Sequence, residues 1–394
     1  MMIHSTLSAL SLNITDGKHG DCENSPTSGY YFISCKDVRD GTIHYEDARQ
    51  ITERDFLDAH KRTLLEPNDI LITNSGTIGR MAFVTDTLQT SKTTFQKSVA
   101  IVKPNPNKII PKYLYYVLLN SIDSFITQAN GSAQKNLLLS TMRSFNLFID
   151  DDKQVQARIA SILSAYDNLI ENNQKQIKLL EEAAQRLYKE WFVDLRFPGW
   201  ENTKIVDGVP EGWEKLPLSS FADIVMGQSP KSEFYNTTHD GIPFHQGVGS
   251  YGKRFVVDNI FSNSYARIAE AGSILFSVRA PVGRLNITKN KIAIGRGLAA
   301  LNHKKGYQSF LFYLLKDRFF KDDLLGNGSI FASISKNELY NQVFIVPNNF
   351  LANQYNIIVS KIDRKISIID EQLNRLVKTR DGLLSKLMNA ETEV

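Results

Sequence analysis

The chain has 394 residues, of which 42% are hydrophobic and 22% charged, and its 46 basic and 42 acidic side chains leave a formal charge of +4. This composition excludes a disordered chain, and the length allows two or three domains. The small positive excess permits a nucleic-acid partner without requiring one, because local patches matter more than the sum.

Cysteine usage and hydropathy indicate a reducing, aqueous setting. Cys22 and Cys35 are too far apart for a Cys-x-x-Cys motif and too few for a disulfide framework. The start, MMIHSTLSAL, lacks the basic residues and long apolar core of a signal peptide. No window approaches the roughly 18 consecutive apolar residues of a membrane span. We therefore expect a cytoplasmic protein with no membrane partner.

The first half contains a strand followed by a glycine-rich turn. The apolar run at 70–72 predicts a buried strand, and NSGTIGRM (74–81) follows it directly. A turn of this kind can cradle phosphate, but this one lacks the Lys-Ser/Thr pair that holds a nucleotide and its metal. We interpret it as a structural turn, with Arg80 packing the fold or touching a DNA backbone. Farther on, 131–150 ends in a second strand-like run.

A long helical pattern closes the first half. Residues 153–191 contain neither proline nor glycine and place apolar side chains at helical spacing. The heptad a positions are Ile159, Tyr166, Asn173, Leu180 and Leu187, and the d positions are Ile162, Leu169, Gln176 and Ala183. The acidic run Asp150, Asp151, Asp152 before it is interpreted as an N-terminal cap rather than a nuclease centre.

The second half repeats the first. After a Pro- and Gly-rich loop (197–213), an offset of 204 places GSILFSVRAPVGR (272–284) over NDILITNSGTIGR (68–80), so that Gly283-Arg284 meets Gly79-Arg80. Residues 328–347 likewise resemble 131–150. A second long helix is predicted over 353–391. Its a positions are Val359, Ile366, Leu373, Arg380 and Leu387, and its d positions are Ile362, Ile369, Leu376, Leu383 and Ala390.

This duplication predicts an α+β fold with two pseudo-symmetric globular domains at opposite ends of an antiparallel pair of long helices. We expect a first globular domain at 1–150, a long helix at 151–197, a linker at 198–212, a second globular domain at 213–349 and a second long helix at 350–394. The alternative is that each helix covers only its own domain. The unusual helix lengths and nearly continuous apolar seams favour a mutual pair.

Two similar domains held at a fixed distance suit duplex DNA, and their different sequences predict two unlike half-sites. Loop-like stretches hold side chains that suit base edges or phosphates. The candidates are Lys18, His19, Lys97, Gln134 and Lys135 in the first half, and Gln228, Lys231, His245, Gln246, Lys253, Arg254 and Arg279 in the second. For any one of them, a solvated loop is the alternative.

No segment matches a catalytic motif. The patterns GxxxxGK[ST], GxGxxG, GxSxG and HExxH are absent, and PNPN (104–107) does not match the Asn-Pro-Pro-aromatic motif of amino-methyltransferases. The seven histidines show no metal-ligand spacing. We therefore expect no catalytic and no metal-binding residues.

In their order, these motifs resemble the specificity subunits of type I restriction-modification systems, over nearly the whole chain. The resemblance rests on ITDGKHGD (14–21), GYYFISCKDVRDG (29–41), NDILITNSGTIGR and GSAQKNL (131–137), then on VPEGWEKLPL (209–218), GQSP (227–230), GIPFHQG (241–247), SVRAPVGR (277–284) and IGRGLAAL (294–301). The segment LYKEWFVDLRFPG (187–199) resembles the central conserved region of that family. The lead-in before the first domain is shorter than is usual in the family.

The resemblance implies two target-recognition domains that each read half of a bipartite, asymmetric DNA site. The long helices would act as a ruler and as the docking surface for two adenine methyltransferase subunits, with restriction subunits in the full complex. This chain would need no cofactor, because S-adenosylmethionine, ATP and Mg²⁺ belong to the partners. The partner would flip and methylate the adenine. Two other interpretations are a coiled-coil adaptor with protein-binding end domains and a stand-alone modification or cleavage enzyme.

Overall fold

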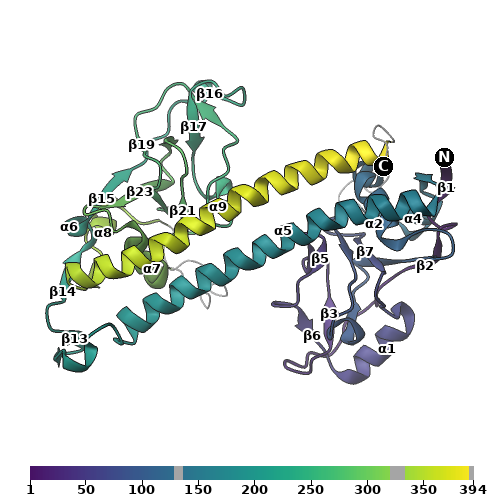
Figure 1. Ribbon diagram of the computed structural model, residues 1–394, viewed down its shortest axis with the longest axis horizontal. Helices are drawn as coiled ribbons and strands as arrows, with labels where there is room; N and C mark the ends of the chain where they lie inside the picture. Colours follow the sequence, from purple (N-terminus) through teal and green to yellow (C-terminus); the bar gives the residue numbers. More distant parts are fainter. Residues whose placement is uncertain (128–135, 320–332, 390–394) are drawn as a thin grey trace. The chain divides into compact units, whose positions relative to one another are not determined.

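The structure, a computed structural model, describes residues 1–127, 136–319 and 333–389, which fall into two compact units (Figure 1). Unit 1 comprises Met1–Asn172 and Leu373–Val394, and unit 2 comprises Asn173–Gln372. Two long helices, α5 (Lys153–Tyr188) and α9 (Asn349–Met388), each give part of their length to each unit.

Unit 1 is built on a four-stranded antiparallel sheet with the order β2-β10-β7-β8. These strands are β2 (Ser11–Asp16), β10 (Val99–Pro104), β7 (Ile70–Thr73) and β8 (Met81–Phe83). A second sheet has the order β6-β3-β9, in which β3 (Tyr31–Ile33) and β9 (Thr93–Phe95) are parallel and β6 (Arg49–Gln50) is antiparallel. The other elements are β1 (Met2–Thr6) paired with β11 (Asn146–Asp150), β4 (Val38–Arg39) paired with β5 (Thr42–Ile43), α1 (Glu53–Thr63), α2 (Pro111–Asn120), α3 (Ile122–Thr127) and α4 (Leu139–Ser144).

Unit 2 repeats this plan, with a four-stranded sheet in the order β15-β23-β20-β21 and a parallel pair in its second sheet. The four strands are β15 (Ala222–Met226), β23 (Leu298–His303), β20 (Ile274–Ser277) and β21 (Leu285–Ile287). The second sheet contains β16 (Tyr235–Asn236), β18 (Phe261–Ser262), β17 (Ile242–His245), β22 (Ile292–Ile294) and β19 (Ile268–Ala269), with β17 and β22 parallel. The others are β12 (Ile205–Val206), β13 (Val209–Pro210), β14 (Glu214–Pro217), β24 (Val343–Val346), α6 (Leu218–Phe221), α7 (Gln308–Phe319) and α8 (Lys336–Tyr340).

The predicted strand, tight turn and Gly-Arg pair are present in both units. In unit 1 the amide of Arg80 donates to Thr73 Oγ1 at 2.9 Å, and in unit 2 the amide of Arg284 donates to Ser277 Oγ at 2.8 Å. Gly79 and Gly283 have φ values of 89° and 85°, a conformation that side chains with a Cβ rarely adopt. The same turn therefore forms in both units, with a hydroxyl group (Thr73 or Ser277) as hydrogen-bond acceptor and a glycine at the position of positive φ.

The helix segments run antiparallel within each unit. In unit 1, Leu387 of α9 shares a core with Ile159 of α5, and Arg380 Nη1 lies 2.9 Å from Asp167 Oδ1. In unit 2, Tyr355 Oη of α9 donates to the carbonyl of Ala184 of α5 at 3.0 Å. In each unit, residues of higher number on α5 meet residues of lower number on α9. The predicted α+β class with two related globular parts and a long antiparallel helix pair is confirmed.

The heptad assignment was wrong for part of α5. The predicted d positions Ile162 and Leu169 are 39% and 50% exposed, whereas Ile159, Leu163 and Ala184 are buried. The less exposed residues keep a seven-residue spacing in a shifted register, with Leu163, Ile170, Ile177 and Ala184 in one row. In unit 1 this row packs on the globular core, which includes Tyr113 and Leu114 of α2, as well as on α9.

Candidate nucleic-acid interface

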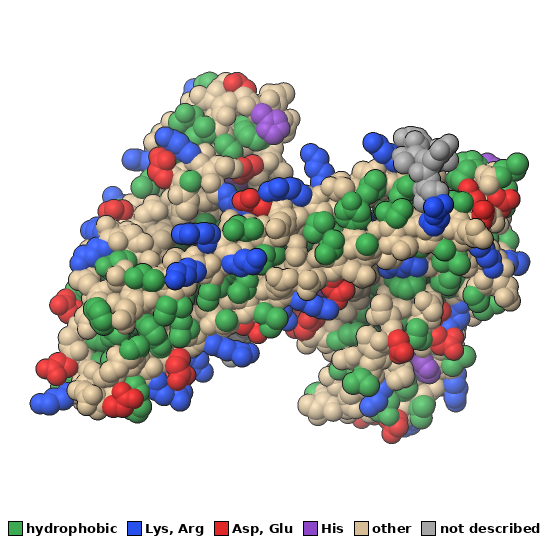
Figure 2. Space-filling model, viewed as in Figure 1, with side chains coloured by type: hydrophobic (Ala, Val, Ile, Leu, Met, Phe, Trp, Pro, Cys, Tyr) green, Lys and Arg blue, Asp and Glu red, His purple; other side chains and the backbone are tan. Residues whose placement is uncertain are grey.

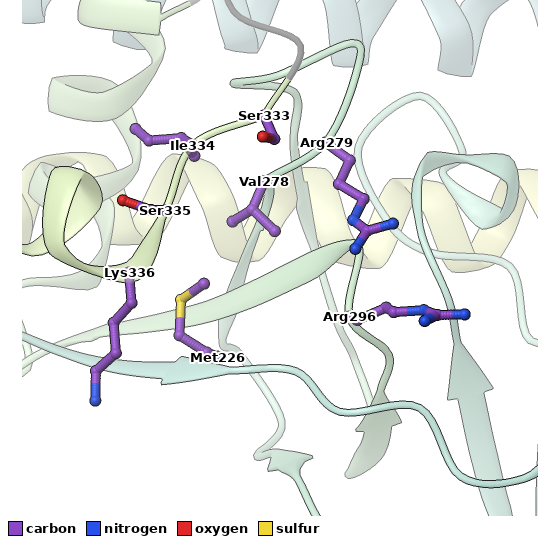
Figure 3. Close-up of a pocket in the computed structure, with 8 residues that line it drawn as sticks. All are labelled: Met226, Val278, Arg279, Arg296, Ser333, Ile334, Ser335 and Lys336. Atoms are coloured by element: carbon purple, nitrogen blue, oxygen red, sulfur yellow. The ribbon is translucent and has the colours of Figure 1, made fainter.

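A basic cavity of about 420 Å³ lies in unit 2, near the ends of β15 and β20 and the start of α8 (Figure 3). It is lined by Arg279, Arg296 and Lys336, together with Met226, Val278, Ser333, Ile334 and Ser335. All three cations are exposed. In the part of the chain that the structure describes, none of the three has an ion-pair partner. Their charge is therefore free to attract an anion such as a DNA phosphate.

Backbone hydrogen bonds fix the three segments that carry these cations. The amide of Val278 donates to the carbonyl of Gly297, and the amide of Ile334 donates to the carbonyl of Val278, both at 2.9 Å. Arg279 faces Ser333 in an isolated antiparallel bridge. The cavity wall thus joins the turn after β20, the loop before β23 and the residues before α8.

A capping box places Lys336 at the first position of α8. Ser335 Oγ accepts from the amide of Glu338 at 3.3 Å, and Glu338 Oε2 accepts from the amide of Ser335 at 2.7 Å. These hydrogen bonds with Ser335, first the one from its backbone amide, hold the pKa of Glu338 below its ordinary value. The nearest carboxylate along α8 is therefore engaged in the cap.

Two predicted glutamines lie beside the basic cavity. Ser229 Oγ donates to Gln246 Oε1 at 2.7 Å and accepts from the amide of Arg296 at 3.1 Å. The amide of Gln228 donates to the carbonyl of Ile294 at 2.9 Å. The structure therefore brings the predicted Gln228, Gln246 and Arg279 together with Arg296, which was not predicted. Both glutamine side chains are exposed.

Unit 1 carries the same backbone frame with different side chains. The amide of Lys18 donates to the carbonyl of Phe95 at 2.8 Å, and the amide of Lys97 donates to the carbonyl of Lys18 at 3.1 Å. Ser75 forms an isolated antiparallel bridge with Asn136, as Arg279 does with Ser333. By these pairings Lys97 stands where unit 2 has Arg296, Lys18 where it has Gln228, and Ser75 where it has Arg279.

The DNA-contact candidates of unit 1 differ in exposure and in whether they already form an ion pair. Lys18 Nζ lies 3.0 Å from Asp58 Oδ2 of α1, and this hydrogen bond raises the pKa of Lys18. His19 has a side chain that is 60% exposed, with Nε2 at 3.1 Å from Asp16 Oδ2. Lys97 is exposed. Gln134 and Lys135 lie outside the described residues.

Burial removes His245 and Arg254 from the candidate base readers. His245 is 1% exposed, with Nδ1 at 2.7 Å from Ser250 Oγ and Nε2 at 2.9 Å from Asp258 Oδ1. Arg254 is 5% exposed, and its guanidinium pairs with Glu181 of α5 and Asp363 of α9. Side chains held in this way cannot reach a groove, so the structure contradicts the predicted base-reading role of both residues, whose hydrogen bonds and ion pairs lie inside unit 2.

The two remaining lysines lie at the surface and do not line the basic cavity. Lys231 is exposed, with Nζ at 3.7 Å from Glu233 Oε1. Lys253 is also exposed and lines a second cavity, which Arg254 shares. No helix within 1–127, 136–319 or 333–389 is long and apolar enough to cross a membrane.

Comparison with known proteins decides the family. A family model described as the type I restriction modification DNA specificity domain matches residues 19–182 and 210–378, one match for each repeat. The chain belongs to the type I restriction-modification DNA specificity family. Members of this family, and therefore this chain, determine DNA sequence specificity in a restriction-modification system.

Curated members of this family align with this chain over most of their length. The putative type I restriction enzyme MjaX specificity subunit of Methanocaldococcus jannaschii is 32% identical over 310 residues, covering 75% of this chain and 72% of that protein. The MjaIX specificity subunit of the same organism is 25% identical over 364 residues, covering 88% and 82%. The crystal structure of a type I restriction-modification S subunit from M. genitalium has a TM-score of 0.61 at 17% identity, covering 98% and 96%. That likeness supports the fold.

The candidates named from the sequence did not include Arg296 or Lys336, although Arg296 stands in the quoted stretch IGRGLAAL (294–301). The hairpins align at 204, but Arg296 stands 199 residues after Lys97, its structural counterpart. Aligning the strand that follows each residue, β10 and β23, would have paired them. Lys336 gave a weaker signal, since only the Ser335–Glu338 capping pattern marks the start of α8.

Proposed function

We propose that the chain is the non-catalytic DNA-reading subunit of a cytoplasmic type I restriction-modification complex, with each globular domain reading one half of a bipartite, asymmetric site. The observation that carries this proposal is the cluster of Arg279, Arg296 and Lys336, three cations without ion-pair partners in the described chain, at one cavity. Such a cluster binds phosphates and, through arginine, guanine edges.

The different side chains on one repeated frame support two unlike half-sites. Where unit 2 presents two arginines and a glutamine, unit 1 presents Ser75, Lys97 and Lys18. A guanidinium can bind guanine O6 and N7 with two donors in a fixed plane, whereas a lysine ammonium is a point charge and a serine hydroxyl can donate or accept. Equivalent positions in the two domains would therefore select different bases.

The proposed readers keep the exposed residues named from the sequence. They are Lys18, His19, Lys97, Gln134 and Lys135 in the first domain, and Gln228, Lys231, Gln246, Lys253 and Arg279 in the second, to which we add Arg296 and Lys336. The proposed domains are 1–150 and 213–349, joined by the helix at 151–197 and the linker at 198–212, with the second helix at 350–394. Most of the linker, 198–209, falls between the two family matches, which supports this division.

The long helices are the proposed docking surface for two adenine methyltransferase subunits, and restriction subunits would complete the complex. Large apolar side chains stay exposed on them: Ile162, Leu169 and Leu179 on α5 and Ile357, Ile358 and Ile368 on α9. Figure 2 shows hydrophobic side chains over the visible faces of these helices. Exposed apolar surface of this kind is typical of a protein interface. S-adenosylmethionine, ATP and Mg²⁺ would be bound by the partners.

The test is to co-express the chain with its methyltransferase and map methylated adenines across a genome. A split motif with two distinct halves is the expected result. Arg279→Ala or Arg296→Ala should cost about 1–3 kcal/mol of site discrimination and relax one half only. The control is Arg196→Ala, because Arg196 is an exposed arginine outside both globular domains that already pairs with Glu190 at 3.1 Å.

Three outcomes would contradict this function. A continuous short palindrome would argue against two unlike readers. Unchanged motifs in both variants would remove the basic cavity from the interface. Methylation or cleavage by the purified chain alone would favour a stand-alone enzyme, and the absence of any DNA selectivity in the complex would favour a protein adaptor.

A further inference from the structure

The hydroxyl group of Ser229 joins two of the proposed readers of unit 2. Its Oγ accepts a hydrogen bond from the amide of Arg296 at 3.1 Å and donates one to Oε1 of Gln246 at 2.7 Å. A backbone N–H can only donate, so the Ser229 oxygen is the acceptor in its bond with Arg296. The single proton of the hydroxyl is then left for Gln246, where only Oε1 can accept it. These partners fix which end of the Gln246 amide faces the protein.

Two buried glycines enclose the same end of Gln246. A Cβ on Gly295 would lie 2.5 Å from Gln246 Oε1 and 3.0 Å from its Cδ, so the side-chain amide packs directly on this glycine. The amide of Gly297 donates to the Gln246 carbonyl at 3.2 Å, and a Cβ on Gly297 would lie 2.5 Å from that carbonyl oxygen. The backbone and the oxygen end of Gln246 are therefore held together against the segment that carries Arg296.

The nitrogen end of the Gln246 amide is left for a ligand. The side chain is exposed, and Nε2 has no hydrogen-bond partner among residues 1–127, 136–319 and 333–389. A glutamine with both ends available pairs with adenine, because Oε1 accepts from adenine N6 while Nε2 donates to N7. Here Ser229 donates to Oε1 and Gly295 packs against it, which obstructs the acceptor of that pairing. Gln246 instead presents two N–H donors.

The nearby arginines are also donors. The amide of Val278 donates to the carbonyl of Gly297 at 2.9 Å, which holds the segment of Arg279 against the segment of Arg296. Both arginines are exposed and line the basic cavity (Figure 3), and a guanidinium has no acceptor. Guanine is the base that presents two acceptors and no donor in the major groove, N7 and O6. A set of donors on one surface therefore suits a guanine edge better than an adenine edge.

We propose that Gln246 reads a guanine in the second half-site and that Ser229 is a positioning residue that excludes adenine there, an inference that rests on the proposed function. Thymine offers a single acceptor, O4, beside a methyl group, and matches two donors less well. A phosphate offers acceptors but carries no sequence information. Thymine at this position and a phosphate contact are therefore the alternatives that the test separates.

The test maps methylated adenines made by the full chain together with its methyltransferase. Gln246→Glu keeps the shape of an exposed side chain but replaces the two donors by an acceptor, and a carboxylate suits the N4 donor of cytosine. Methylation at the original sites should fall about 10-fold, and the affected guanine should change to cytosine in the motif.

Ser229→Ala removes the group that fixes the Gln246 amide, so the amide can turn over and pair with adenine. Methylation of sites with adenine at this position, relative to sites with guanine, should rise about 10-fold. Ser229→Thr keeps a hydroxyl and should restore the preference for guanine. The matched control is Ser232→Ala, because Ser232 is an exposed serine three residues farther along the chain that forms no hydrogen bond with Gln246. This control should keep the original motif.

The unmodified chain separates failure of the proposed function from failure of this inference, because the proposed function fails when no split motif appears. With a split motif present, adenine or thymine at the position that Gln246→Glu alters would overturn the assignment of guanine. An unchanged motif in Gln246→Glu would indicate a phosphate contact and overturn the reading role. An equal loss at all sites in a folded Ser229→Ala chain would reduce Ser229 to a support of the fold. If Ser229→Ala does not fold, Gln246→Glu still decides whether guanine is read.

Discussion

Replacing Arg254 by methionine tests how much its ion pairs with Glu181 of α5 and Asp363 of α9 stabilise unit 2. Methionine keeps an apolar stem against Phe312 but leaves Asp363 and Glu181 without their cation. The side chains of these two acids are 20% and 28% exposed, so solvent compensates only in part. Removing one partner of a buried ion pair costs about 3–5 kcal/mol, and this partial exposure places our expectation at about 3 kcal/mol. With an m-value of about 2–3 kcal/mol/M in urea, the unfolding midpoint should fall by at least about 1 M.

Tryptophan fluorescence reports this transition selectively. All three tryptophans of the chain, Trp191, Trp200 and Trp213, lie in unit 2. The matched control is Arg380→Met, which removes the cation from the corresponding carboxylate, Asp167, in unit 1 and should shift this signal much less. Adding Asp363→Asn to Arg254→Met should restore part of the loss, because a neutral amide is no longer a stranded charge. An unchanged midpoint in Arg254→Met, or a further full loss in the double variant, would refute the reasoning.

Two further predictions concern unit 2. Burial lowers the pKa of His303 from 6.5 to about 4, and its Nδ1 accepts from the amide of Lys305 at 3.1 Å, so the folded chain holds a neutral ring. As the pH falls from about 6.5 to about 4, the unfolded chain takes up the proton first, so the free energy of unfolding of unit 2 should fall by about 2 kcal/mol between pH 7 and pH 5. His303→Asn keeps a hydrogen-bond acceptor but does not titrate, so urea titrations should show a weaker pH dependence of its stability. An equal pH dependence in the variant would contradict a neutral, buried His303. In Gly227→Ala the new Cβ would lie 2.1 Å from the carbonyl oxygen of Gly295, whereas Gly247→Ala meets nothing within 4 Å. The first variant should lose at least about 2 kcal/mol and blur one half-site in the methylation map, the second neither, and equal behaviour would count against the close approach.

The duplicated fold was readable from local patterns. The strand-turn-strand units around Gly79 and Gly283 depend on neighbours in sequence, so an alignment of the chain with itself found both. The seam of α9 was also predicted well, since Val359, Ile366 and Leu387 are buried. The seam of α5 was placed in the wrong register, since Leu163 and Ala184 are buried whereas the predicted Ile162 and Leu169 are exposed.

The candidate site could likewise be predicted only in part. Side-chain type and loop position selected Gln246 and Arg279, which lie together. The same criteria selected His245 and Arg254, which are buried by partners 13 and 109 residues away, Asp258 and Asp363. Whether a polar loop residue faces solvent or the interior depends on such distant partners, and a single sequence does not reveal them.

The division of the long helices between the units imposes an order on synthesis. Unit 2 is one continuous stretch, Asn173–Gln372, whereas unit 1 needs residues from both ends of the chain. Ile159 and Leu163 leave the ribosome long before Leu384 and Leu387, which share their core. The domain made first is therefore the last to be completed, and until the final helix arrives one face of the nascent α5 remains uncovered. A chain that stops before Leu373 would contain all residues of unit 2 but would lack the part of α9 that completes unit 1.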